Sequence, residues 1–137
     1  MPRLDSTVCG MGMNTTEVTM EHITTPSPKL AAAAIAQRAA EVSIELATTV
    51  RGPLKPVADQ LIRAASSVAL NLAEGAGHIG GSRKHHWRIA YGSALESSSA
   101  LGLLQAAGKI NHQRASEAEA LLDRCRAMTW RLIHGGG

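Results

Sequence analysis

Four segments of this chain, each about 20 residues long, repeat apolar residues at alternating spacings of three and four. In the first segment, from Leu30 to near Arg51, the spacing joins Ile35, Val42 and Leu46. Because an α-helix has about 3.6 residues per turn, such residues lie on one helix face. Four amphipathic helices of matched length predict an all-α fold, an up-down four-helix bundle.

Glycine and proline mark where the predicted helices end. Gly52-Pro53 should stop the first helix, and Pro56 should begin the second, since proline lacks only an N–H that a first turn does not use. The glycines at 75, 77, 80 and 81 should break the second helix. Ser82 is the expected N-cap of the third, which runs to about Ala107, and the fourth ends at His134.

The composition supports this fold class and excludes others. Hydrophobic residues make up 45% of the 137, but aromatic residues only 2%, with no Phe. Alanine and leucine suit closely packed helices better than β-sheets, which favour aromatic and β-branched residues. No apolar run reaches about 18 residues, so no membrane span is predicted and a soluble protein is expected.

The domain organisation is predicted to be simple. Residues 1–28 are rich in Thr, Ser, Gly and Pro and are expected to be a disordered tail; 29–134 form the bundle, and 135–137 a flexible C-terminus. Cys9 and Cys125 are too few and too far apart for a disulfide framework. Since the start lacks the pattern of a secretory signal, a cytoplasmic location is expected.

Several motifs resemble chemical sites but lack the context these sites need. Residues 75–80 match G-x-G-x-x-G, yet they follow a helix rather than a strand, so no nucleotide or other cofactor is predicted. No nucleophile with a base and no carboxylate pair is evident, so no catalytic residue is predicted and the protein is expected not to be an enzyme.

A metal site is also not predicted. Zinc needs three or four convergent ligands. His85 and His86 are neighbours on a helix and therefore point about 100° apart. The other candidates, spread along the sequence, are His78, His112, Cys125 and His134.

Arg83, Lys84 and Arg88 form the densest basic cluster, together with His85 and His86. Clustered cations attract phosphate through release of counterions. We therefore predict that these three residues contact nucleic acid, RNA or DNA; the alternative is a solvated basic face.

A line of polar residues runs along the second predicted helix. Arg63, Ser67, Asn71 and Glu74 follow at spacings of four, four and three. We predict that this line is concealed against another copy of the chain, where its charges would have to be paired; the alternative is exposure to solvent. Small residues around the third helix, including Gly92 and Ser93, also favour a contact between protomers, although a solvated serine-rich side would produce the same pattern.

The segment 60–75, QLIRAASSVALNLAEG, resembles the signature Q-L-x-R-A-x-x-S-x-x-x-N-I-A-E-G of the 23S rRNA intervening-sequence family of four-helix-bundle proteins. Residues 82–96 are similar to a second family segment, S-x-x-E-F-x-x-F-x-x-I-A-x-G-S-x-x-E. The matching positions include Arg63, Ser67, Asn71, Glu74, Gly75, Gly92, Ser93 and Glu96. The chain departs from the pattern at Ala76, His85 and His86.

The resemblance implies a bundle that assembles into a ring, commonly a homopentamer. Its relatives include the accessory variability determinants of diversity-generating retroelements, which bind a reverse transcriptase and nucleic acid. The expected function is therefore that of an oligomeric, non-enzymatic scaffold that contacts nucleic acid. The alternative is an adaptor that binds other proteins and no nucleic acid.

Overall fold

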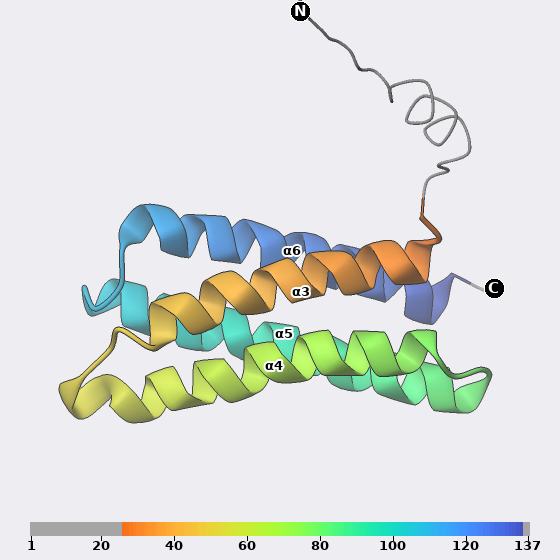
Figure 1. The fold of residues 1–137 in the computed structure, drawn as a ribbon, viewed down its shortest axis with the longest axis horizontal. Helices are drawn as coiled ribbons and strands as arrows, with labels where there is room; N and C mark the ends of the chain where they lie inside the picture. The colour runs from red at the N-terminus through yellow and green to blue at the C-terminus, as the bar shows by residue number, and fades with distance from the viewer. Residues whose placement is uncertain (1–25, 136–137) are drawn as a thin grey trace, which may run out of the picture.

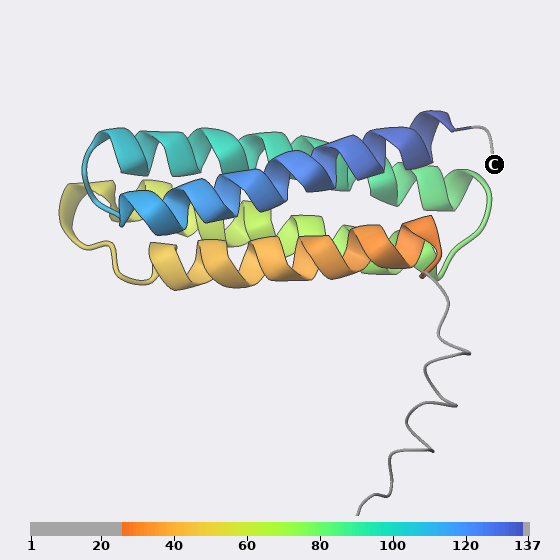
Figure 2. The same cartoon turned by 90° about the horizontal axis from the view of Figure 1, so that it is seen from above.

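The computed structural model describes residues 26–135, which form an antiparallel bundle of four long helices (Figures 1 and 2). They are α3 (Pro28–Ala47), α4 (Lys55–Ala76), α5 (Gly81–Ala106) and α6 (His112–His134), with a short 3-10 helix, η1 (Gly52–Leu54), before α4. Neighbouring helices pack around the bundle in the order α3, α4, α5, α6 and back to α3. The predicted all-α, up-down bundle is confirmed.

The core is built from aliphatic residues, as expected for a chain without Phe. Alanines fill much of the buried face of α3, and leucines from the other helices, such as Leu61, Leu104 and Leu122, are fully buried. Trp87 is the single aromatic residue buried within 26–135. Small alanines let α3 approach its neighbours closely, while the leucines supply most of the apolar area removed from water.

The first helix ends earlier than predicted, at Ala47 rather than near Arg51. The hydroxyl groups of Thr48 and Thr49 donate to the carbonyl oxygens of Glu45 and Leu46 and so satisfy the last turn. The chain then turns through Gly52, whose φ of 82° favours glycine. The helix therefore ends ahead of the Gly-Pro pair, and the two threonine hydroxyls bond to carbonyl groups of its last turn.

The joint between α4 and α5 also differs from the prediction. Gly75 does not break the second helix, which continues to Ala76. The third helix begins at Gly81, with Gly80 at the N-cap position and a φ of 68°, rather than after a Ser82 cap. The turn thus occupies Gly77–Gly80 and depends on the left-handed backbone of Gly80.

Three further sequence predictions can be compared with the structure. On α6 the apolar spacing predicts one buried stripe of Ala118, Leu121, Cys125, Met128 and Leu132. Ala118 and Cys125 are buried, but Leu121, Met128 and Leu132 are only partly buried, and Leu122, Thr129 and Ile133 are buried in their place. The predicted disordered tail lies outside the described residues apart from 26–28, where the Ser27 hydroxyl caps α3 by accepting a hydrogen bond from the Leu30 N–H. Of the predicted flexible end, only Gly135 is described. Within 26–135, none of the helices combines the length and the apolar character that crossing a bilayer requires.

Candidate functional site

The polar line of α4 lies along its seam with α5 of the same chain. The Ser67 and Ser93 hydroxyl oxygens are 2.7 Å apart across this seam. Asn71 Nδ2 donates to the Ser67 carbonyl oxygen at 2.9 Å, and Asn71 Oδ1 lies 2.9 Å from Nδ1 of His86. The middle of the line therefore has hydrogen-bond partners within the chain itself, and its concealment by a second copy stays a prediction.

The two charged ends of the line remain at the surface. Arg63 is exposed and makes no ion pair with any residue in 26–135. Glu74 is also exposed, and its carboxylate lies 3.1 Å from Nε2 of His78. Both charged ends are therefore exposed to solvent in the single chain, which agrees with the alternative of a solvent-exposed line.

Gly75 is required by the packing of Trp87. A Cβ atom at position 75 would lie 2.7 Å from Nε1 of Trp87 and 2.8 Å from its Cδ1. Trp87 is only 3% exposed, and its Nε1 has no hydrogen-bond partner among the described residues. The guanidinium carbon of Arg83 lies 5.5 Å from the centroid of the same ring, a cation–π distance. Gly75 therefore serves helix contact rather than helix termination.

The outer face of α5 carries the other positions that match the family pattern. A Cβ at Gly92 would meet nothing within 4 Å, so this glycine faces open space. Glu96 is exposed on the same face. Large aliphatic side chains stand there too: Ile89 is 38% exposed, Leu95 47% and Leu103 61%. This face combines small and apolar residues that the single chain leaves uncovered.

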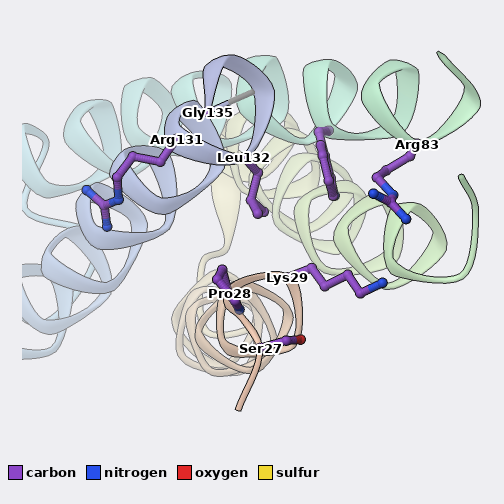
Figure 3. Close-up of a pocket in the computed structure, with 8 residues that line it drawn as sticks. Ser27, Pro28, Lys29, Arg83, Arg131, Leu132 and Gly135 are labelled. Carbon is purple, nitrogen blue, oxygen red and sulfur yellow. The ribbon is translucent and has the colours of Figure 1, made fainter. Parts of the chain in front are cut away.

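The predicted basic cluster lies at the end of the bundle where α3 begins and α6 ends. Here a hollow of about 410 Å³ is lined by Lys29 from α3, Arg83 from α5 and Arg131 from α6 (Figure 3). Lys84 lines a neighbouring hollow with Arg83, and Arg88 lines another with Trp130. We call Lys29, Arg83, Lys84, Arg88 and Arg131 the basic end. The tertiary structure thus adds Lys29 and Arg131, which lie far from the cluster in sequence.

Ion pairing differs between the two ends of the bundle. At the opposite end, Arg114 pairs with Glu45 and Glu117, and Lys55 pairs with Asp59. Among residues 26–135, none of the five cations of the basic end lies within ion-pair distance of a carboxylate. Their charge is therefore available to an external anion.

An aromatic group borders the basic end. The rings of Trp130 and His134 are 3.8 Å apart between centroids, and Tyr91 lies 6.0 Å from Trp130. Trp130 is 51% exposed, although an indole ring is usually largely buried. Flat, exposed rings beside cations can stack on the bases of an unpaired strand.

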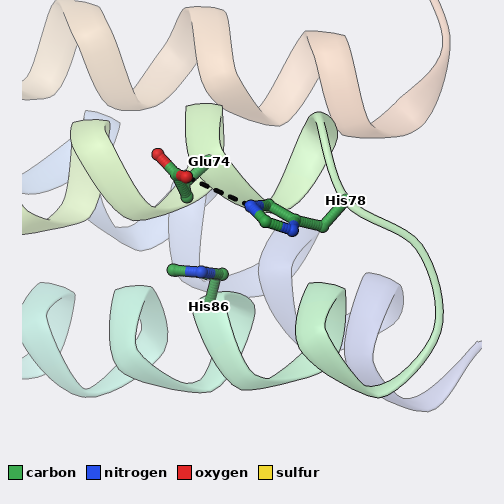
Figure 4. A group of neighbouring side chains, drawn as sticks. All are labelled: Glu74, His78 and His86. Carbon is green, nitrogen blue, oxygen red and sulfur yellow. Dashed lines mark hydrogen bonds and ion pairs between the residues drawn. The ribbon is translucent and has the colours of Figure 1, made fainter.

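Two histidines that are not neighbours in sequence, His78 and His86, lie close together beside Glu74. Glu74, His78 and His86 each offer a candidate ligand atom within 4.8 Å of the other two (Figure 4). Sequence reasoning considered the neighbours His85 and His86 and missed this group. The spacing of four between Glu74 and His78 was the available signal.

Cys125, another ligand candidate named from the sequence, is fully buried in α6, while His112 and His134 lie outside the group of Glu74, His78 and His86. Burial raises the pKa of its thiol to about 11. Because the thiolate is the form that binds metals and attacks electrophiles, Cys125 is a structural residue.

Comparisons with known proteins agree with the fold. The model of a family described as 23S rRNA-intervening sequence protein matches residues 31–131. Among solved structures, a protein of unknown function from the S23 ribosomal protein family of Bacteroides thetaiotaomicron is similar, with a TM-score of 0.55 and 16% identity. The match covers 73% of this chain and 98% of that one. No curated protein matches.

Proposed function

The chain belongs to the family of 23S rRNA-intervening sequence proteins, and from this premise we propose that it is a non-enzymatic scaffold that binds single-stranded nucleic acid at the basic end. The observation that carries this proposal is that Lys29, Arg83 and Arg131, cations from three helices, line one hollow at this end of the bundle, with the guanidinium of Arg131 directed to its outer side (Figure 3). Helices α3, α5 and α6 all contribute to this surface (Figure 3).

The electrostatics favour a polyanion. Cations without carboxylate partners release counterions when they bind phosphates, and this release supplies most of the non-specific affinity for nucleic acid. At the opposite end Lys55 is already paired with Asp59, whose Oδ1 lies 3.0 Å from its Nζ, and Arg114 is paired with Glu45 and Glu117, although Arg51 and Lys109 make no ion pair with residues 26–135. A phosphate backbone therefore meets more unpaired cations at the basic end than at the opposite end.

The aromatic group favours an unpaired strand over a duplex. Trp130 and Tyr91 lie beside Arg88 and Arg131, so a strand whose phosphates contact the arginines would bring its bases near the rings. Stacking of a base on an aromatic ring contributes about 1–3 kcal/mol. Bases in a duplex are stacked on one another and cannot use these rings.

Fluorescence anisotropy with a labelled single-stranded RNA tests the proposal. At about 50 mM salt, Lys84→Glu with Arg88→Glu should weaken binding by at least roughly tenfold and flatten the dependence of log K on log salt. Arg83 is left intact because its Nε donates to the carbonyl oxygen of His78. Trp130→Ala should weaken binding to the single strand, by roughly tenfold, without changing the salt slope.

Arg51→Glu with Lys109→Glu is the matched control, since it makes the same change in charge at the opposite, exposed end. Its RNA affinity should stay close to that of the parent. Absence of RNA binding at low salt, or equal losses in the two double variants, would refute the proposal.

We also propose that the chain assembles with copies of itself through the outer face of α5, as the ring-forming, commonly pentameric, relatives imply. The exposed Leu95 and Leu103 support this. Removing their apolar surface from water would stabilise an assembly of chains. Leu95→Glu with Leu103→Glu should then reduce the mass measured by light scattering to that of one chain. A monomeric parent at about 100 μM, well above the Kd of a stable assembly, would refute this second proposal.

The same apolar face favours the alternative function, an adaptor for another protein, for which a reverse transcriptase is the partner that the resemblance implies. The variants separate the two functions. Charge reversal at Lys84 and Arg88 should leave the binding of a protein partner through α5 unchanged, whereas it should weaken the binding of RNA.

A further inference from the structure

Glu74, His78 and His86 lie at the joint between α4 and α5, outside the proposed nucleic-acid surface. Glu74 comes from the last turns of α4, His78 from the connecting turn and His86 from α5, and all three side chains extend into the same space (Figure 4). We propose that they bind a divalent transition metal ion of the Zn²⁺ class. Two imidazole nitrogens and one carboxylate oxygen would be the protein ligands, with a fourth position open to water.

The distances fit such a site. In a tetrahedral zinc site with bonds of about 2.0–2.1 Å, neighbouring ligand atoms are about 3.3 Å apart. Glu74 Oε2 and His78 Nε2 are already 3.1 Å apart. The three candidate ligand atoms lie within 4.8 Å of one another. The rings of His78 and His86 are stacked, with centroids 5.1 Å apart, so binding requires the His78 ring to rotate as well as a closure of roughly 1.5 Å. Glu74 and His78 can supply it by side-chain rotation, because both are partly exposed.

Asn71 orients His86 for this role. The amide of Asn71 is fixed because its Nδ2 donates to the Ser67 carbonyl oxygen at 2.9 Å. Its Oδ1 must therefore accept from Nδ1 of His86, at 2.9 Å. A neutral imidazole that carries its proton on Nδ1 has a free electron pair on Nε2, the atom that can ligate a metal. Such a hydrogen bond to the second ring nitrogen accompanies nearly all metal-bound histidines.

His78 has an equivalent partner in Ser82, whose Oγ lies 3.2 Å from Nδ1 of His78. Nε2–H of His78 donates to the carboxylate of Glu74 in this structure. When a metal occupies the space between them, the proton of the neutral ring resides on Nδ1 and is donated to Ser82 Oγ. Both histidines therefore have an acceptor for the one proton that they retain.

The nature of the ligands limits the ion. Imidazole nitrogens favour zinc, copper, nickel and cobalt, whereas calcium and magnesium prefer oxygen ligands. The nearby Arg83 is engaged elsewhere, since its Nε donates to the backbone carbonyl of His78 and its guanidinium lies over Trp87. Exposure of Glu74, at 57% of its side chain, provides an entry path.

Isothermal titration of the full chain with ZnCl₂, after removal of bound metal with a chelator, tests the site. We expect one ion per chain and no binding of Mg²⁺ under the same conditions. His78→Gln and His86→Gln should each weaken the affinity by at least tenfold, as should Asn71→Ala, because loss of an outer hydrogen bond typically costs about 10–100-fold. His85→Ala, next to His86 but outside the group, is the matched control and should bind like the parent.

A second readout checks folding and binding together. Saturating Zn²⁺ should raise the Tm of the parent by on the order of 10 °C when the free ion is about 100-fold above Kd. The shift should fall by at least about half in His78→Gln, because a tenfold loss of affinity leaves the ion only about tenfold above Kd. Position 78 lies outside the helices, so this variant is expected to leave the fold intact. Absence of Zn²⁺ binding to the parent, or equal affinity in the parent, His78→Gln and His86→Gln, would overturn the proposal.

Discussion

Replacing Gly75 by alanine should destabilise this bundle, although alanine is the better helix former. In an unhindered helix interior the change from glycine to alanine gains about 1 kcal/mol. At position 75 the new methyl group would lie 2.7 Å from Nε1 and 2.8 Å from Cδ1 of Trp87. Contacts that close do not occur between unstrained atoms, so one of the two helices or the ring must move.

The magnitude follows from how little the ring can move. Trp87 is 3% exposed, so its indole cannot swing into solvent without opening the core. Overpacking of this kind costs about 1–3 kcal/mol. Set against a helix gain of about 1 kcal/mol, the net destabilisation is centred near 1 kcal/mol, or a fall in Tm of about 4 °C or more.

Urea unfolding followed by circular dichroism measures the effect, with Gly92→Ala as the control. Nothing lies within 4 Å of a Cβ at position 92, so this variant should gain up to about 1 kcal/mol. Transitions recorded at two chain concentrations separate this gain from any effect on assembly. The two glycine variants should therefore shift stability in opposite directions.

A double-mutant cycle identifies the cause. In a Trp87→Phe background the smaller ring lacks Nε1 and leaves room for the methyl group, so Gly75→Ala should become neutral or stabilising. The coupling energy should be on the order of 1–2 kcal/mol. If Gly75→Ala stabilises the parent, or if the coupling is absent, the close contact with Trp87 does not explain the glycine.

Three further predictions concern other parts of the bundle. Burial raises the folded-state pKa of the Cys125 thiol from 9.0 to about 11. The folded state therefore holds this proton more tightly than the unfolded state, and the resulting stabilisation is complete below pH 9.0 and is lost as the pH rises towards 11. The free energy of unfolding should therefore fall in the parent relative to Cys125→Ala by up to about 2.7 kcal/mol over this range, and parallel pH profiles in urea titrations would contradict the assignment. Ser67→Ala and Ser93→Ala should each cost about 1 kcal/mol, while the double variant should cost clearly less than their sum. In the double variant neither hydroxyl is left without the other, and Asn71 Nδ2 loses its bond to Ser67 Oγ but keeps its bond to the Ser67 carbonyl oxygen. A fully additive double variant in the same titrations would contradict this. The side chain of Arg126 is 17% exposed and donates to Ser98, Glu119 and Asp123. Arg126→Met should therefore lower the free energy of unfolding by about 1–2 kcal/mol. Thermal unfolding should show nearly the same difference between parent and variant at high salt, because these partly buried contacts are shielded from screening.

The sequence by itself determined the class of fold and the number of helices. Apolar spacing is a local property of each segment, and four segments of similar length leave few ways to bury their apolar faces other than a bundle. The family-like segments around Asn71, Glu74 and Gly75 were also readable as a pattern, since patterns need no coordinates.

The positions of the helix ends were harder to predict from the sequence, because local hydrogen bonds and packing against other helices both influence where a helix ends. Gly75 was read as a helix breaker, but the gap it leaves for Trp87, a residue of the next helix, keeps it inside α4. The first helix ended at Ala47, ahead of the Gly-Pro pair, and the hydroxyls of Thr48 and Thr49 bond to carbonyl groups of its last turn. A single residue type can thus end a helix or continue it, and packing decides which.

Only the tertiary structure decided which distant side chains meet. Lys29 and Arg131 join Arg83 at one end because the bundle brings the start of α3 and the end of α6 to the start of α5. His78 and His86 meet through the turn at Gly80, whose backbone angle no spacing rule predicts. Periodicity specifies which face of each helix is buried, whereas the rotation and register of one helix against another follow from the fit of side chains in the core.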